Sequence, residues 1–115
     1  MFDDRSSSAL RVAVAGLAAR QTAIANNISN IETPGYRARK VKFEEELKTA
    51  MDKGGSASDV TPSVLTSLEP TRLNGSNVNL DEETLSHIDT TMRYNLAIRA
   101  MDGKYSLLRE AIKGA

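Results

Sequence analysis

The stretch from Ala25 to Tyr36, ANNISNIETPGY, decides where the amino-terminal part of the chain stops being helical. Asparagine is a mediocre helix former, and its amide needs hydrogen-bond partners when it is buried, yet three asparagines stand here among apolar residues. Pro34 disfavours helical geometry at Thr33, so we expect the helix to end near Glu32. A Thr-Pro-Gly-Tyr turn should follow at once.

The residues before this stretch carry the apolar spacing of a coiled-coil seam. Apolar side chains recur at intervals of four, three, seven, four and three residues, and Gln21 fills the one polar position. The seam consists of Leu10, Val14, Leu17, Ile24, Ile28 and Ile31. The hydroxyls of Ser6–Ser8 can cap the start of this predicted helix.

A second long helix should begin near Leu80, with Asn79 as its N-cap and Glu82 three residues further on. Its first apolar stripe is Leu85, Ile88 and Met92. Its second stripe is Tyr94, Ile98, Met101, Tyr105, Leu108 and Ile112. Because the stripe changes register between Met92 and Ile98, we expect that this helix does not present one seam to one neighbour throughout.

The middle of the chain has weaker signals. Residues 36–43 could be extended, whereas Phe43, Leu47 and Met51 are four residues apart and suggest a short helix. Residues 52–77 are rich in glycine, serine and proline, so they read as a linker or a mobile segment. The sequence therefore predicts an all-α fold in which residues 1–33 and 80–115 form a coiled-coil hairpin. Residues 34–79 form the turn and a largely flexible middle.

Composition excludes several classes of function. The 115 residues balance 15 basic against 15 acidic side chains and include no cysteine, so no net charge favours nucleic acid and no thiolate site can form. The single histidine, His87, cannot make a multi-histidine metal site within one chain. The acids at 44–46 and 81–83 stand where solvated helix starts favour acid, and no nucleophile or base accompanies them. We therefore expect neither an enzyme nor a cofactor.

Two further features bear on location and contacts. No apolar run is long enough to span a bilayer, and the start MFDDRSSSAL lacks the regions of a cleaved secretory signal, so any export should use another route. The basic cluster Arg37–Lys42 directly precedes three glutamates. It is either a solvated, self-compensating face or a contact for an acidic neighbouring subunit. Two long helices with so little middle leave apolar stripes for other chains to cover, which predicts a subunit of an assembly.

The stretch NNISNIETPGY resembles the signature of the bacterial flagellar axial proteins, the rod and hook family. In that signature the first helix ends in Asn-Asn-x-x-Asn-x-x-Thr-Pro-Gly-Tyr, and Ser29 stands here where alanine is expected. The matching positions are Asn26, Asn27, Asn30, Thr33, Pro34, Gly35 and Tyr36. The carboxy-terminal segments GSNVNLDEET and MRYNLAIRAMDGKYSLLREAIKG are similar to the last helix of the basal-body rod proteins.

The resemblance implies a structural subunit, exported unfolded by the flagellar type III apparatus and polymerised through both terminal helices into a torque-transmitting rod. Its partners would be copies of itself, other rod and basal-body proteins and the export gate, without nucleic acid or membrane insertion. It would lie in the basal-body rod, which crosses the periplasm. A soluble helical-hairpin adaptor or secretion chaperone is the alternative.

The resemblance also suggests roles for individual residues. The asparagines would form hydrogen bonds between subunits, although a polar last turn that caps the helix explains them too. Phe43 and Leu47 fit the Phe-x-x-x-apolar pattern that the export gate reads in this family. Local packing is the other explanation for that spacing.

Overall fold

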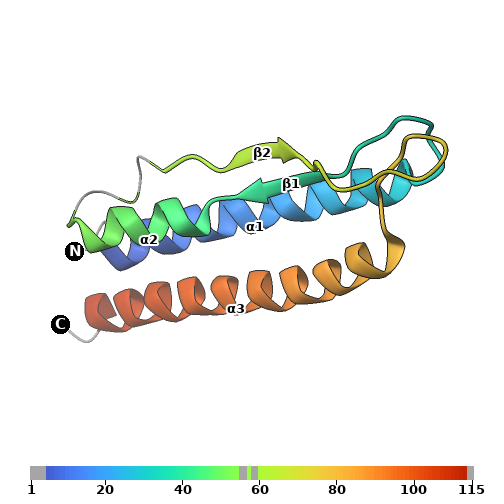
Figure 1. Ribbon diagram of the computed structural model, residues 1–115. Helices are drawn as coiled ribbons and strands as arrows, with labels where there is room; N and C mark the ends of the chain where they lie inside the picture. Colours follow the sequence, from blue (N-terminus) through green and yellow to red (C-terminus); the bar gives the residue numbers. More distant parts are fainter. Residues whose placement is uncertain (1–4, 55–56, 58–59, 114–115) are drawn as a thin grey trace.

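The computed structural model of the chain describes residues 5–54, 57 and 60–113. Its elements follow the order α1 (Arg5–Ser29), β1 (Arg39–Lys42), α2 (Glu44–Asp52), β2 (Ser63–Thr66) and α3 (Leu80–Lys113). The two long helices run antiparallel side by side, and α1 lies between α3 and the β1–β2 pair (Figure 1). The molecule is elongated, with extents of 65 × 27 × 15 Å.

The start of α3 agrees closely with the sequence prediction, and the end of α1 agrees less closely. α3 begins at Leu80 as predicted, and the Oδ1 of Asn79 accepts a hydrogen bond from the backbone N–H of Glu82 at 3.2 Å, which confirms the cap. α1 ends at Ser29 rather than near Glu32. The chain then continues in tighter turns, because the N–H of Thr33 donates to the carbonyl of Asn30 at 3.0 Å.

The middle of the chain contains a small sheet. β1 and β2 pair antiparallel, with Arg39 opposite Thr66 and Val41 opposite Val64. β1 and α2 lie where an extended segment and a short helix were predicted, but β2 lies within the segment interpreted as linker. The prediction of an all-α fold was therefore incomplete: the chain is mostly helical and has a two-stranded pair in the middle.

A narrow, aliphatic core joins α1 to its neighbours on both sides. Within the described residues it is built from small and medium side chains, with Phe43 as the one large ring. Its buried members are Val12, Leu17, Ala23, Val41, Phe43, Ala57 and Ala97. The radius of gyration of 17.6 Å exceeds the value of about 13 Å for a compact domain of this length, so much apolar surface lies outside this core.

Gly16, in the middle of α1, lies directly beneath the ring of Phe43. A Cβ at this position would lie 2.4 Å from the Cδ1 atom of the ring, far inside van der Waals contact. Glycine costs a helix interior about 1 kcal/mol relative to alanine, so its presence here is explained by the close approach of the ring.

We therefore expect Gly16→Ala to lower the free energy of unfolding by about 1–3 kcal/mol, because overpacking outweighs the gain in helix propensity. Urea unfolding measures this difference. Gly103→Ala in α3 is the matched control, since a Cβ there meets nothing within 4 Å, and it should raise stability by about 1 kcal/mol. Equal effects of the two substitutions would show that the ring does not restrict position 16.

Candidate functional site

Asn27, in the last turn of α1, joins three elements through one side chain. It is 0% exposed. Its Nδ2 donates to the carbonyl of Arg39 in β1 at 3.0 Å and to Oε1 of Glu83 in α3 at 2.9 Å. Its Oδ1 accepts from the N–H of Arg39 at 2.9 Å. We refer to Asn27, the Arg39 backbone, Glu83 and Lys40 as the asparagine clasp.

Glu83 gives the clasp a buried negative charge. Its side chain is 2% exposed in the first turn of α3, where the helix dipole favours an anion, and the Nζ of Lys40 lies 3.6 Å from its Oε1. A carboxylate can stay buried only with such partners. The prediction of a solvated acidic helix start holds for Asp81 and Glu82, which are exposed, and was wrong for Glu83.

The other two asparagines of the motif lie closer to solvent. The Nδ2 of Asn30 donates to the carbonyl of Asn26 at 2.8 Å, and its Oδ1 accepts from the hydroxyl of Thr33 at 3.1 Å. Asn30 therefore caps its own helix, and Asn27 has its amide engaged within the chain. The role between subunits that was expected of the asparagines stays a prediction, and the side chain of Asn26 is exposed.

The Thr-Pro-Gly-Tyr turn packs against a second turn before α3. The N–H of Gly35 donates to the carbonyl of Asn74 at 2.7 Å. Gly35 and Gly75 have φ of 75° and 85°, and a Cβ on Gly75 would lie 3.1 Å from the Cα of Gly35. The two backbones thus meet where only glycine fits without strain.

Asn77 holds the segment before α3 against the start of β1. Its Oδ1 accepts from the N–H of Ala38 at 2.6 Å, and its Nδ2 donates to the carbonyls of Ser67 at 3.2 Å and Glu69 at 3.1 Å. Its own N–H donates to the carbonyl of Tyr36 at 3.2 Å. The sequence analysis did not single out Asn77. Because the N-cap is already supplied by Asn79, a second asparagine two residues earlier was a signal that its amide binds elsewhere.

The predicted seam of α1 faces the chain's own core. Leu17 and Ile24 are buried at 5% and 3% exposure. The remaining members are half-buried: Leu10, Val14, Ile28 and Ile31. This seam is therefore partly closed within one subunit.

The two predicted stripes of α3 lie on opposite faces of the helix, since nine residues separate Leu85 from Tyr94 and turn the helix by about two and a half turns. The first stripe faces solvent, at 69%, 52% and 67% exposure for Leu85, Ile88 and Met92. Leu96, which the sequence did not single out, extends it at 69%.

The second stripe lies toward α1. Four of its residues are half-buried, namely Tyr94, Ile98, Met101 and Leu108. Two others, Tyr105 and Ile112, are exposed near the end of the helix. The predicted change of register is confirmed.

Phe43 lies in the core. Its side chain is 3% exposed, and the guanidinium of Arg20 lies 5.2 Å from the centre of its ring. Arg20 also donates to both carboxylate oxygens of Glu44 at 2.7 Å, and this hydrogen bond holds the pKa of Glu44 below its ordinary value, against the opposing effect of partial burial. Leu47 is half-buried against the same core.

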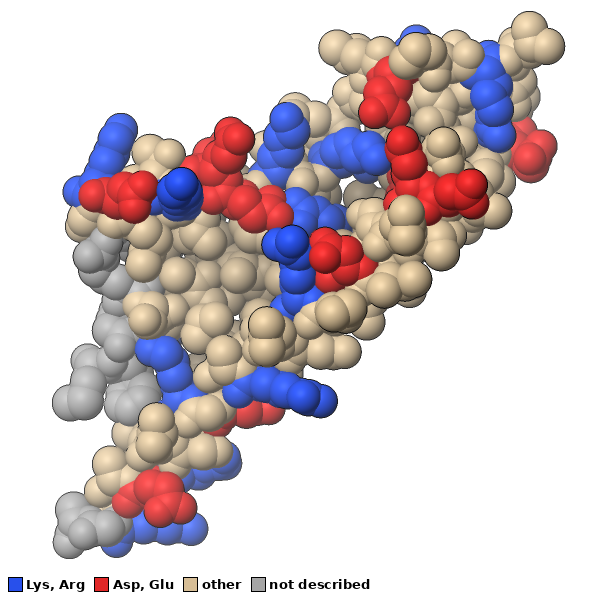
Figure 2. All heavy atoms as spheres, turned by 60° about the horizontal axis from the view of Figure 1, so that its bottom comes forward, with Lys and Arg blue, Asp and Glu red and all other residues tan. Residues whose placement is uncertain are grey.

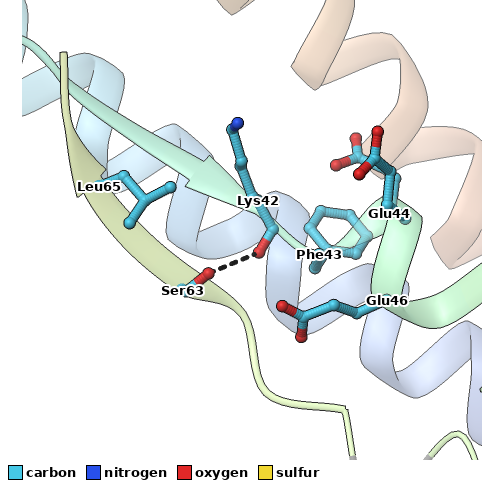
Figure 3. A pocket seen from close by; sticks show the side chains of 7 residues that line it. Lys42, Phe43, Glu44, Glu46, Ser63 and Leu65 are labelled. Atoms are coloured by element: carbon cyan, nitrogen blue, oxygen red, sulfur yellow. Dashed lines mark hydrogen bonds between the residues drawn. The ribbon is translucent and has the colours of Figure 1, made fainter. Parts of the chain in front are cut away.

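A depression of about 400 Å³ lies beside this ring. Figure 3 shows Glu44 and Glu46 on either side of Phe43, and Leu65 lies on the neighbouring strand β2. The hydroxyl of Ser63 donates to the carbonyl of Lys42 at 3.4 Å across the strands. Its lining consists of Lys42, Phe43, the three glutamates 44–46, Ser63 and Leu65.

Charges of both signs are interspersed over the face that Figure 2 shows, with uncharged surface between them. Within the basic cluster, Lys40 pairs with Glu83, and the guanidinium of Arg39 lies 5.9 Å from the centre of the Tyr36 ring. Arg37 donates to the carbonyl of Ser67 at 3.5 Å. The cluster is therefore used at least partly within the chain.

Comparison with known proteins identifies the family. The family model of flagella basal body rod proteins matches residues 10–37, from α1 through the Thr-Pro-Gly-Tyr turn. The flagellar basal body rod protein FlgB of Escherichia coli (strain K12) is 32% identical in a match that covers 88% of this chain and 90% of that protein. The chain belongs to the flagellar basal body rod protein family.

Other rod proteins named FlgB are similar over most of their length. FlgB of Bacillus subtilis (strain 168) is 31% identical in a match that covers 83% of each chain. FlgB of Salmonella typhimurium (strain LT2) is 27% identical in a match that covers 96% of this chain and 97% of that protein. The likeness that the two terminal motifs suggested is confirmed, and the interpretation as an adaptor or chaperone falls away.

As a member of the rod protein family, the chain is a structural component of the flagellar basal body rod and not an enzyme. Among the residues that the structure describes, no group of three or more acids or histidines could hold a metal ion. None of the described helices is long and apolar enough to cross a bilayer. The asparagine clasp begins inside the matched segment, at Asn27, and reaches Arg39 and Glu83 beyond it.

Proposed function

We propose that this rod protein is a structural subunit of the proximal rod, which polymerises with copies of itself and with other rod proteins and transmits torque along the rod axis. The outer face of α3 carries this proposal. Its side chains Leu85, Ile88 and Met92 are more than half exposed, whereas the faces that α1 and α3 turn toward each other are partly buried within the chain. An unpartnered apolar stripe of this length is typical of a protein–protein contact.

The terminal segments 1–33 and 80–115 form one coiled-coil domain in this proposal, and residues 34–79 brace it and carry the export motif. The half-buried seam residues of α1 and the second stripe of α3, which lies toward α1, hold the hairpin together. The first stripe of α3, referred to below as the outer stripe, and the exposed Asn26 are then available to neighbouring subunits. The 4–3 spacing of both helices supports a coiled-coil arrangement.

The export part of the proposal concerns Phe43 and Leu47. The subunit leaves the cytoplasm through the flagellar type III apparatus as an unfolded chain, and the export gate reads these two side chains. Their spacing of four residues supports this role. Because Phe43 is buried once the chain has folded, recognition has to precede folding.

The experiment replaces one residue of the outer stripe, Met92, and expresses the variant in cells that lack their own copy of this rod protein. Met92→Asp should leave secretion unchanged, because the exported chain is unfolded, and should prevent incorporation into basal bodies, because a charge in a dry seam is costly. His87→Asp is the matched control, since His87 is exposed on α3 outside the stripe. Normal motility and normal rod content with Met92→Asp would contradict the proposal.

A further inference from the structure

The outer face of α3 has charges of opposite sign at its two ends. Leu85, Ile88, Met92 and Leu96 form the apolar centre of the face, at 52% to 69% exposure. Asp81 precedes them and Arg99 follows them, and both charged side chains are exposed. Eighteen residues separate Asp81 from Arg99, which is five turns of helix, so they lie on the same face about 27 Å apart.

This pattern is complementary to itself when one copy is reversed. In an antiparallel pair centred near residue 90, Asp81 of each helix meets Arg99 of the other, and Ile88 lies beside Met92. Leu85 then lies beside Leu96. A parallel pair in register would instead place Asp81 against Asp81 and Arg99 against Arg99, which is unfavourable.

We propose that the outer face of α3 binds the same face of a second copy of this chain, antiparallel and with two-fold symmetry. The charge complementarity at both ends argues for this occupant. Neither Asp81 nor Arg99 has an ion-pair partner among the residues that the structure describes, so both charges are available. A closed two-fold contact uses the same surface patch twice and stops at a dimer.

The dimer competes with rod assembly, and this second step rests on the proposed function. Subunits related by rotation about and translation along one rod axis all point in the same direction, whereas the two copies of an antiparallel pair point in opposite directions. The pair therefore cannot be a contact of the rod. It covers the stripe that rod neighbours would use, so it withholds the subunit from assembly until it dissociates.

Sedimentation equilibrium of the purified full-length chain tests the dimer. We expect a concentration-dependent dimer whose affinity falls about tenfold with Arg99→Glu, because both symmetric ion pairs become repulsive. Asp81→Arg should have the same effect, and the double substitution should restore the affinity. Arg109→Glu, an exposed arginine elsewhere on α3, is the control and should change little. A monomer at all concentrations, or two single effects that the double substitution does not reverse, would overturn the proposal.

Cross-linking tests the direction of the pair, since the chain has no cysteine of its own. A mixture of Leu85→Cys and Leu96→Cys chains should give the mixed disulfide. Neither variant alone should cross-link, because an antiparallel pair separates identical positions by about 15 Å or more along the axis. Disulfides between identical variants without the mixed product would indicate a parallel pair and overturn the proposal. Circular dichroism of each variant excludes loss of helix as the cause.

The cross-linked dimer also tests the competition. Added to basal bodies or to purified rod proteins, it should fail to incorporate, and reduction of the disulfide should restore incorporation. Incorporation of the oxidised dimer would refute competition and leave the proximal-rod function standing. Failure of the wild-type chain to incorporate at all would instead count against the proposed function, and the sedimentation result would be unaffected.

Discussion

Asn27→Leu should lower the free energy of unfolding by about 3 kcal/mol or more. Leucine fills a similar volume but leaves the N–H and the carbonyl of Arg39 without their partner, and it removes a donor from the buried carboxylate of Glu83. The Arg39 groups are partly buried and the Glu83 carboxylate is buried, so water could replace the lost partners only in part. Urea unfolding of the variant and of the wild-type chain measures the loss.

The control and a second substitution make this prediction specific. Asn26→Leu changes the neighbouring asparagine, whose side chain is exposed, and should change stability by less than about 0.5 kcal/mol. In the Asn27→Leu background, Glu83→Met should recover part of the loss, because it removes the buried charge that lost its donor. Strictly additive losses from Asn27→Leu and Glu83→Met would mean that the two side chains do not interact.

Phe43→Ala should lower the free energy of unfolding by about 3–5 kcal/mol, the usual cost of removing a buried ring. The ring is 3% exposed, lies against Gly16 and is covered by the guanidinium of Arg20, so the cavity cannot easily collapse. Leu47→Ala should cost less, because Leu47 is half-buried. Denaturant unfolding of both variants gives the comparison.

The same variant separates packing from export. If the gate reads Phe43 in the unfolded chain, Phe43→Ala should reduce secretion even though a less stable fold is easier to unfold. Leu17→Ala is the matched control: it also removes a buried core side chain but lies outside the motif, so its secretion should stay normal. Equal secretion of the two variants would show that Phe43 is a packing residue only.

The long helices could be predicted because their signals are local. Asn79 as a cap and a proline just beyond the asparagines fix the helix ends within a few residues, and the apolar spacing identifies the faces. The change of register in α3 could also be read from spacing alone. Even so, spacing did not show which of the two stripes faces α1, since that depends on how α3 packs in the folded chain.

β2 could not be predicted from its own sequence, Ser63–Thr66. It is four residues long, and Val64 and Leu65 are both exposed, so it has none of the alternation that marks a half-buried strand. Its pairing depends on β1, which lies more than twenty residues earlier. The burial of Asn77 and Glu83 was missed for a similar reason, because Ala38, which donates to Asn77, and Asn27, which donates to Glu83, lie far away in the sequence.

The bonds between the Asn27 side chain and the backbone of Arg39 have a consequence for the alignment of β1. The side chain offers one acceptor and one donor at one position along α1. Only one residue of the strand can therefore place both its backbone N–H and its carbonyl against them. Slippage of β1 by one residue would present Ala38 or Lys40 there and turn Val41 from the core toward water. A short strand with lysines on both sides of one valine has little of its own to prevent such an error, so the last turn of α1 sets its register.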